Sequence, residues 1–280
     1  MRHSQVGAVT RDFEGGATDP VALSVILPCY RAAGLAIASA ETLASFLHGR
    51  ISRWEIIVVD DGGGDFPASP FGANWGTGGS VRLIQLPKNR GKGAAVAAGM
   101  RAATGAVRIF TDVDLPYGIA PILLLESIIR TRRIHVVIGD RTFPQSRYAT
   151  DLPVMRRAAS RVFSLITATL VTGGFFDTQC GLKGFRGDVA DALFALQRLE
   201  RFSFDVELIY LALTYGLEIK RVPVVLEVNR TSSVRIGRDS VRSLADLARL
   251  RFNRFRGRYD CPQLEELVAT ECSSVTETLR

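Results

Sequence analysis

After residue 20, the hydrophobic residues of the chain fall into short continuous runs separated by longer amphipathic segments. The run at 21–28 (VALSVILP) contains one polar residue and ends in proline, which is typical of a strand buried on both faces of a parallel sheet. Residues 35–48 place leucine and phenylalanine among alanines, as in a helix, and 54–59 (WEIIVV) is a second buried run. This alternation predicts an α/β fold with a mostly parallel central sheet flanked by helices.

The same alternation continues along the chain. Further strands are predicted at 81–86, 107–111, 134–139 and 218–227, and further helices at 92–103, 119–131, 155–171 and 203–215. The segment 62–79 is rich in glycine and proline and is predicted to be a surface loop. We therefore expect a single domain over 21–256, preceded by a flexible segment at 1–20 and followed by a flexible, polar tail at 257–280.

Charge and cysteine usage narrow the class of protein. The net charge of +7 implies anionic partners, such as a nucleotide, a phospholipid or a nucleic acid. The arginine-rich end of the chain lacks the interleaved aromatic residues on which bases stack, which disfavours a nucleic acid. The four cysteines are widely separated and include no CxxC pair, so we expect buried thiols rather than a zinc site or a disulfide framework.

No segment has the composition of a membrane span. The longest uncharged apolar run, 162–176, has 15 residues, whereas a span needs about 18. The first residues are polar and lack the apolar stretch of a secretory signal. The sequence thus predicts a cytoplasmic protein that is soluble or peripheral at the inner face of the membrane.

Polar residues collect where the predicted strands end. Tyr30, the pair Asp60-Asp61 and the pair Asp112 and Asp114 each follow a strand, and open α/β sheets bind ligands at this edge. Two carboxylates on a rigid strand end can hold a hard cation such as Mg²⁺ or Mn²⁺. As an alternative, Asp112-x-Asp114 could cap the helix that follows.

Two glycine-rich segments lie beside these strand ends. Gly62-Gly63-Gly64 follows Asp60-Asp61 and would let the backbone approach a ligand closely, although the pair could equally form a turn. The segment 89–93 (NRGKG) combines two cations with two glycines at the start of a helix, where free N–H groups favour phosphate. It does not have the spacing of a P-loop, which disfavours a kinase-type NTPase.

Together these segments resemble glycosyltransferase family 2, which has the GT-A fold. Four blocks carry the resemblance in the first half of the chain: SVILPCYR (24–31), EIIVVDDGGGD (55–65), KNRGKGAAVAAGM (88–100) and FTDVDLP (110–116). In the second half, DTQCGLKGFR (177–186) and RFSFDVELIYLALTYGLEIKRVPV (201–224) resemble the dolichyl-phosphate β-glucosyltransferase branch. The resemblance spans about residues 21–256.

The resemblance implies inverting transfer of glucose or a similar sugar from UDP-glucose or a related nucleotide-sugar to a polyprenyl phosphate. Residues that match the nucleotide-binding positions are Pro28, Tyr30 and Asp60 for the base, Asp61 beside them, and Arg90 and Lys92 in the adjoining loop. Asp112 and Asp114 match the diphosphate and metal motif, Arg141 matches an arginine near the reacting phosphates, and Arg230 and Arg235 resemble a late basic loop over the diphosphate.

The chemistry of these groups is coherent with such a transfer. A metal on Asp114 and arginine guanidinium groups can stabilise the negative charge that develops on the leaving UDP. A phosphate acceptor is already an anion and needs no general base, whereas a hydroxyl acceptor would need one. Asp205 is then the expected base, unless Asp205 and Glu207 only orient the arginines.

The acceptor depends on how the chain reaches a membrane. Enzymes that this chain resembles commonly carry transmembrane helices, so a membrane acceptor would require surface binding here. Residues 239–256 predict a basic amphipathic helix that could bind anionic lipid, or else pack on the core with a solvated basic face. A soluble hydroxyl acceptor, and a non-catalytic nucleotide-sugar-binding module, remain as alternatives; the oligomeric state is left open.

Overall fold

The computed structural model of the chain describes residues 20–72, 75, 78–143, 146–148, 177–227 and 236–278. Its strands are β1 (Leu23–Cys29), β2 (Trp54–Asp60), β3 (Gly79–Gln85), β4 (Val107–Phe110), β5 (Val136–Asp140), β6 (Arg147–Tyr148), β7 (Lys183–Arg186), β8 (Ile219–Pro223) and β9 (Val225–Leu226). Its helices are α1 (Ala33–Leu47), α2 (Lys92–Ala102), α3 (Ala120–Arg132), α5 (Gly187–Leu196), α6 (Phe204–Thr214), α7 (Ile236–Phe255) and α8 (Pro262–Thr278).

A seven-stranded sheet forms the centre of the domain, with the strand order β3-β2-β1-β4-β7-β5-β8. β7 is antiparallel to both of its neighbours, and the other adjacent strands are parallel. β6 and β9 pair separately. The predicted α/β class with a mostly parallel sheet is therefore confirmed. The hydrophobic pattern did not predict the antiparallel strand β7.

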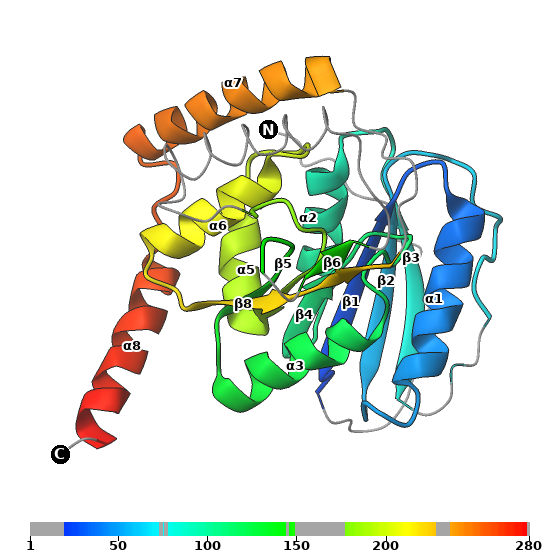
Figure 1. The fold of residues 1–280 in the computed structure, drawn as a ribbon, viewed down its shortest axis with the longest axis horizontal. Helices are drawn as coiled ribbons and strands as arrows, with labels where there is room; N and C mark the ends of the chain where they lie inside the picture. The colour runs from blue at the N-terminus through cyan, green and yellow to red at the C-terminus, as the bar shows by residue number, and fades with distance from the viewer. Residues whose placement is uncertain are drawn as a thin grey trace, which may run out of the picture.

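Helices cover both faces of the sheet (Figure 1). One apolar layer packs α1 and α3 against the sheet, and the other packs α2, α5 and α6 against the opposite face. All seven residues of β1 and of β2 are buried, which explains why these strands appear in the sequence as continuous apolar runs. β3 lies at the sheet edge and is only partly buried.

The end of the chain differs from the expected flexible tail at 257–280, because most of it forms α8. Tyr259 and Leu264 are fully buried against the domain. The carboxylate of Glu271 in α8 lies 2.6 Å from the guanidinium of Arg186 and 2.7 Å from Nε2 of His135. The mean polarity of this segment concealed one apolar face, which anchors it to the core.

The basic amphipathic helix predicted at 239–256 is present as α7, which lies across one side of the molecule (Figure 1). Leu247 and Leu250 are buried in the core, whereas Phe252 and Phe255 are 50% and 89% exposed. α7 therefore packs on the domain and also presents aromatic rings to solvent. The predicted segment 1–20, except Pro20, and the predicted helix 155–171 lie outside the described residues.

Candidate active site

The register of the sheet brings three strand ends to one edge. β1 and β2 end at the paired residues Cys29 and Asp60, and β4 runs parallel to β1 on its other side. Tyr30, Asp61 and the segment 111–114 directly follow these strands. The polar groups that the sequence placed at strand ends thus leave the sheet at its carboxyl edge, where α/β folds bind ligands.

Asp60 and Asp61 hold the loops at this edge by backbone hydrogen bonds. The carboxylate of Asp60 accepts N–H bonds from Gly63 at 2.7 Å and Gly64 at 3.0 Å. The turn that was the alternative role for this pair is therefore present. The carboxylate is almost fully buried, and a contact from Asp60 to a nucleotide base stays a prediction.

Asp61 joins the glycine turn to the neighbouring loop. Its two carboxylate oxygens accept the backbone N–H groups of Arg90 at 2.8 Å and Gly91 at 2.7 Å. Burial raises the pKa of Asp61, and these two hydrogen bonds only partly offset that effect. Gly62, in the glycine turn, has φ +72°, and a Cβ there would lie 2.3 Å from the carbonyl carbon of Lys88. Only glycine therefore allows the glycine turn and the loop that contains Lys88 to approach this closely.

Tyr30 and Arg31 form an exposed pair at the same edge. Tyr30 is 43% exposed, and the guanidinium carbon of Arg31 lies 5.2 Å from the centroid of its ring. Pro28, which precedes them, is buried inside β1. An exposed ring beside a cation offers a surface on which a planar base can stack.

Lys92 and Asp112 form the central ion pair of the site. Nζ of Lys92, at the start of α2, lies 2.5 Å from Oδ1 of Asp112. Burial tends to lower the pKa of Lys92, but the charges of Asp112 and Asp205 outweigh it and raise that pKa. A Cβ on Gly181 would lie 1.9 Å from Oδ2 of Asp112, so the 177–181 turn closely backs the carboxylate.

Arg90 lies apart from this pair. Its guanidinium binds the carboxylate of Glu200, and this interaction raises its pKa. The loop at 89–93 therefore divides its cations: Lys92 faces Asp112, whereas Arg90 faces the 197–200 segment. A contact from Arg90 to the nucleotide stays a prediction.

Asp205, the base predicted for a hydroxyl acceptor, lies inside the domain. It is 3% exposed, and its Oδ1 is 2.6 Å from Nζ of Lys183, which is itself fully buried. Lys183 also donates to the carbonyl oxygen of Cys180 at 2.6 Å, which connects the pair to the turn behind Asp112. Burial raises the pKa of Asp205, and the charges of Lys183 and Lys92 only partly offset it.

Arg141 is fixed in place by Asp177. The guanidinium forms two hydrogen bonds with the carboxylate, from Nε to Oδ2 at 2.9 Å and from Nη2 to Oδ1 at 2.7 Å. The backbone N–H of Arg141 donates a third bond to Oδ2, at 2.7 Å. Burial would raise the pKa of Asp177, but Arg141 outweighs it and lowers that pKa. A guanidinium held by two hydrogen bonds, on a backbone held by a third, is well placed to meet an anion without further ordering.

Glu207 serves the architecture rather than the arginines of the site. Its carboxylate accepts backbone N–H bonds from Arg198 and Leu199 and a hydroxyl bond from Tyr259. It therefore ties α6 to the 197–200 segment and to the end of the chain. Glu207 does not orient Arg141 or Lys92 by any of these contacts.

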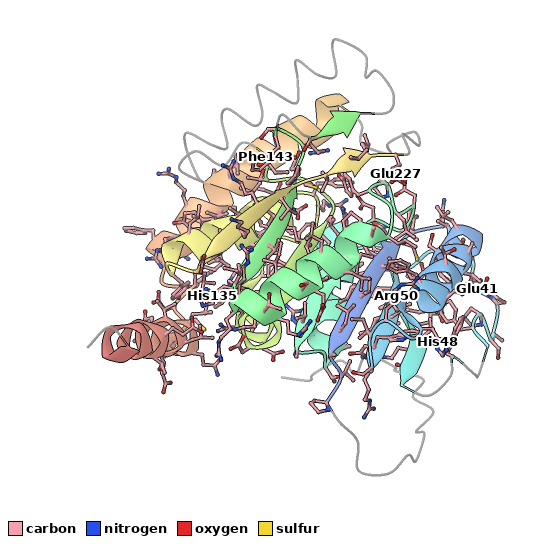
Figure 2. All side chains as sticks on the ribbon, turned by 60° about the horizontal axis from the view of Figure 1, so that its bottom comes forward. Glu41, His48, Arg50, His135, Phe143 and Glu227 are labelled. Atoms are coloured by element: carbon pink, nitrogen blue, oxygen red, sulfur yellow. The ribbon has the colours of Figure 1, made fainter. Side chains whose placement is uncertain are left out.

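The chemistry of the carboxylates fits a divalent cation shared with a ligand. Within the part of the chain that the structure describes, no three His, Cys, Asp or Glu side chains cluster as a metal site. Asp112 and Asp114 would thus supply two hard oxygen ligands, and the remaining positions suit the phosphate oxygens and waters that Mg²⁺ usually keeps. The two described histidines lie apart from each other, because His48 directly follows α1 and His135 directly precedes β5 (Figure 2).

Three groups of the site were not predicted from the sequence. Asp177 fixes Arg141, Gly181 backs Asp112, and Lys183 pairs with Asp205. All three lie in the block 177–186, which carried part of the family resemblance but received no role. Arg230 and Arg235 lie outside the described residues.

These features define an α/β protein with a cluster of charged side chains at the carboxyl edge of its sheet. The model of the family described as "Glycosyl transferase family 2" matches residues 24–194, which is more than half of the chain. The chain therefore belongs to glycosyl transferase family 2, and it is a glycosyltransferase.

The similar proteins define the branch of this family. The chain is 28% identical over 250 residues to the dolichyl-phosphate beta-glucosyltransferase of Dictyostelium discoideum, covering 85% of this chain and 76% of that protein. The protein of the same name from Saccharomyces cerevisiae is 28% identical over 265 residues, covering 86% and 77%. The one from Drosophila melanogaster is 31% identical over 214 residues, covering 72% and 66%.

Solved structures share the fold at lower sequence identity. Glucosyl-3-phosphoglycerate synthase from Mycobacterium tuberculosis, crystallised with Mn²⁺ and UDP-glucose, superimposes with a TM-score of 0.55 and 17% identity. That alignment covers 81% of this chain and 79% of the synthase. The superposition confirms the predicted GT-A architecture.

Proposed function

We propose that this chain transfers a glucose-like sugar from a nucleotide-sugar, with UDP-glucose as first choice, to a polyprenyl phosphate, with inversion at the anomeric carbon. The observation that carries the proposal is the cluster at the carboxyl edge, where Asp112 pairs with Lys92 beside the 177–181 turn and Asp114 follows two residues later in the chain. The names of the similar proteins, dolichyl-phosphate beta-glucosyltransferases, support the acceptor class.

Three groups would act on the diphosphate of the donor. A divalent cation held by Asp112 and Asp114, Mg²⁺ or Mn²⁺, would neutralise charge on the leaving nucleoside diphosphate. Lys92 adds a cation at the same carboxylate, and Arg141 contributes a guanidinium fixed by Asp177. Because these cations are already held by carboxylates, little ordering is required when charge develops.

The surroundings of Asp205 favour a phosphate acceptor over a hydroxyl acceptor. A hydroxyl would have to give its proton to a carboxylate within hydrogen-bond reach. Asp205 is 3% exposed and bound to Lys183, so its carboxylate faces the core and not the open edge. A phosphate monoester is an anion at neutral pH and attacks the anomeric carbon directly, which leaves Asp205 to position Lys92 and, through it, Asp112.

We also propose that the outer face of α7 brings the enzyme to a membrane that contains the acceptor. Phe252 and Phe255 are exposed beside the exposed Arg251, Arg254 and Arg256. Exposed aromatic rings flanked by arginines suit the boundary between anionic head groups and acyl chains. Within the described residues, no helix is both long and apolar enough to cross a membrane.

The proposal is tested by measuring release of nucleoside diphosphate from a panel of nucleotide-sugars, with and without a short polyprenyl phosphate. We expect turnover with UDP-glucose that requires both the polyprenyl phosphate and Mg²⁺ or Mn²⁺. Turnover in the presence of excess chelator would show that the reaction does not need a divalent cation. Transfer to a soluble hydroxyl compound, with none to the phosphate, would replace the acceptor.

A further inference from the structure

A cavity lies beside α2 and β3. It has a volume of about 720 Å³, which is within the size range of small-molecule sites. Its walls come from β3, α2, the 197–200 segment and α7, and neither Asp112 nor Asp114 lines it. We call this cavity the arginine groove.

The floor of the arginine groove is apolar and made of small side chains. Ala94, Ala97, Ala98 and Ala102 lie on one face of α2, at helical spacing, and Ile84 of β3 continues the surface. Ala98 and Ala102 are only partly buried, so they are not covered by the core. An apolar group of a ligand would therefore gain contact area on this floor.

The rim of the groove carries six arginines: Arg82, Arg90, Arg101, Arg198, Arg249 and Arg258. Arg82 and Arg90 each bind a carboxylate, from Glu55 at 3.0 Å and from Glu200. The remaining arginines make the groove a region of excess positive charge.

Two arginines of the rim, Arg101 and Arg198, donate hydrogen bonds to uncharged oxygens. Nε of Arg101 donates to the carbonyl oxygen of Phe194 at 3.0 Å, and Nη2 of Arg198 donates to the carbonyl oxygen of Arg258 at 3.1 Å. Such hydrogen bonds orient a guanidinium without neutralising it. Burial, followed by the charge of Arg90, lowers the pKa of Arg101, as expected where cations are crowded. A bound anion would relieve this repulsion.

We propose that the arginine groove binds an anionic phospholipid, with its phosphate among the rim arginines and part of an acyl chain on the alanine floor. A free anion would use the rim but leave the floor uncovered, whereas a lipid uses both. α7 favours a lipid as the source, because Arg249 and Asn253 of α7 line the groove while Phe252 and Phe255 of the same helix face outward. Only the source of the lipid rests on the proposed function, because the membrane contact proposed for α7 would supply it.

Binding of short-chain lipids in solution tests the inference without a membrane. The probes are dihexanoyl phosphatidylglycerol, dihexanoyl phosphatidylcholine with the same chains, and inorganic phosphate, each titrated calorimetrically below the concentration at which micelles form. We expect phosphatidylglycerol to bind the wild type at least tenfold more tightly than either of the other probes. Equal affinity for phosphatidylcholine, or no binding of phosphatidylglycerol, would overturn the inference.

Two variants divide the floor from the rim. Ala98→Leu fills the floor without changing charge, and Arg101→Gln removes a rim cation; each should weaken phosphatidylglycerol binding about tenfold or more. Arg258→Gln replaces the rim variant should Arg101→Gln fail to fold. Arg132→Gln, on the exposed surface of α3, is the matched control and should bind as the wild type does. Phosphate binding as tight as phosphatidylglycerol binding and unaffected by Ala98→Leu would identify a free-anion site and overturn the lipid.

The same variants separate this inference from the proposed function. Ala98→Leu should transfer sugar to a water-soluble polyprenyl phosphate at the wild-type rate, because neither Asp112 nor Asp114 lines the groove. Loss of lipid binding with intact transfer would leave the proposed function standing. Lipid binding by a wild-type enzyme that transfers no sugar would leave the arginine groove standing.

Discussion

The carboxyl edge and the arginine groove are both rich in cations, but they differ in how those cations are paired. At the edge, Lys92, Lys183 and Arg141 are each held by a carboxylate within 2.5–2.7 Å. In the groove, Arg82 and Arg90 are also held by carboxylates, but Arg101 and Arg198 donate to backbone carbonyls. Paired cations fix the geometry of a reaction centre, whereas cations bound to neutral oxygens keep their charge for a ligand.

The largest effect is expected from removing Lys183, the most deeply buried cation at the carboxyl edge. Lys183→Met would leave the carboxylate of Asp205 buried without its ion pair. We expect a loss of about 3–5 kcal/mol in the free energy of unfolding, measured by urea denaturation. The double variant Lys183→Met/Asp205→Leu should recover part of this loss. A single variant as stable as the wild type would show that the pair does not hold the fold.

The proposed membrane contact of α7 is tested by removing positive charge from this helix. Changing Arg249, Arg251 and Arg254 together to glutamine should weaken binding to anionic vesicles by about 3 kcal/mol at low salt, since each arginine near anionic lipid contributes about 1 kcal/mol. Added salt should weaken wild-type binding in the same assay. Cosedimentation that is unchanged by the triple substitution would remove α7 from the membrane contact.

The glycine behind Asp112 sharpens the account of the edge. Gly181→Ala would place a Cβ 1.9 Å from Oδ2 of Asp112, so the carboxylate or the turn must move. We expect the free energy of unfolding to fall by about 1–3 kcal/mol. The rate of sugar transfer should fall further than this loss of stability alone would cause. Gly34→Ala is the control, because a Cβ there meets nothing within 4 Å. A wild-type rate of sugar transfer by Gly181→Ala would show that transfer does not depend on the close contact between residue 181 and Asp112.

The pairing of Arg141 predicts a small dependence on pH. The pKa of Asp177 is lowered in the folded protein. Its ionised carboxylate therefore stabilises the fold at any pH above the ordinary pKa of aspartate, and this stabilisation is lost as the pH falls through the lowered pKa. Asp177→Asn should therefore be about 1–3 kcal/mol less stable than the wild type near pH 6. The difference should shrink below about pH 4. A difference that is the same at both pH values would contradict the ion pair.

Much of the fold could be predicted because buried parallel strands leave a local signal. β1 and β2 are buried along their full length and therefore appear as continuous apolar runs. β7 could not be found in this way, since the fully buried Lys183 interrupts its pattern and is tolerated only through Asp205. α8 was missed for a related reason, because its average polarity masks the apolar face around Leu264.

The site was predictable only as far as strand ends mark it. Tyr30, Asp61 and Asp112 follow buried strands, and the topology of a parallel sheet brings them to one edge. The partners that fix the site come from distant segments: Asp177 is 36 residues from Arg141, and Asp205 is 22 from Lys183. No local pattern reports such pairs, so they became visible only in the folded chain.

The central claim is that the carboxylates of the edge direct sugar transfer to a polyprenyl phosphate. Its most direct test is the formation of glucosyl-linked polyprenyl phosphate from radiolabelled UDP-glucose and a short polyprenyl phosphate, compared between the wild type and Asp114→Asn at equal thermal stability. We predict lipid-linked product that requires Mg²⁺ or Mn²⁺ in the wild type and at least a hundredfold less in the variant. Equal product from both proteins, or none from the wild type with any nucleotide-sugar, would contradict the account.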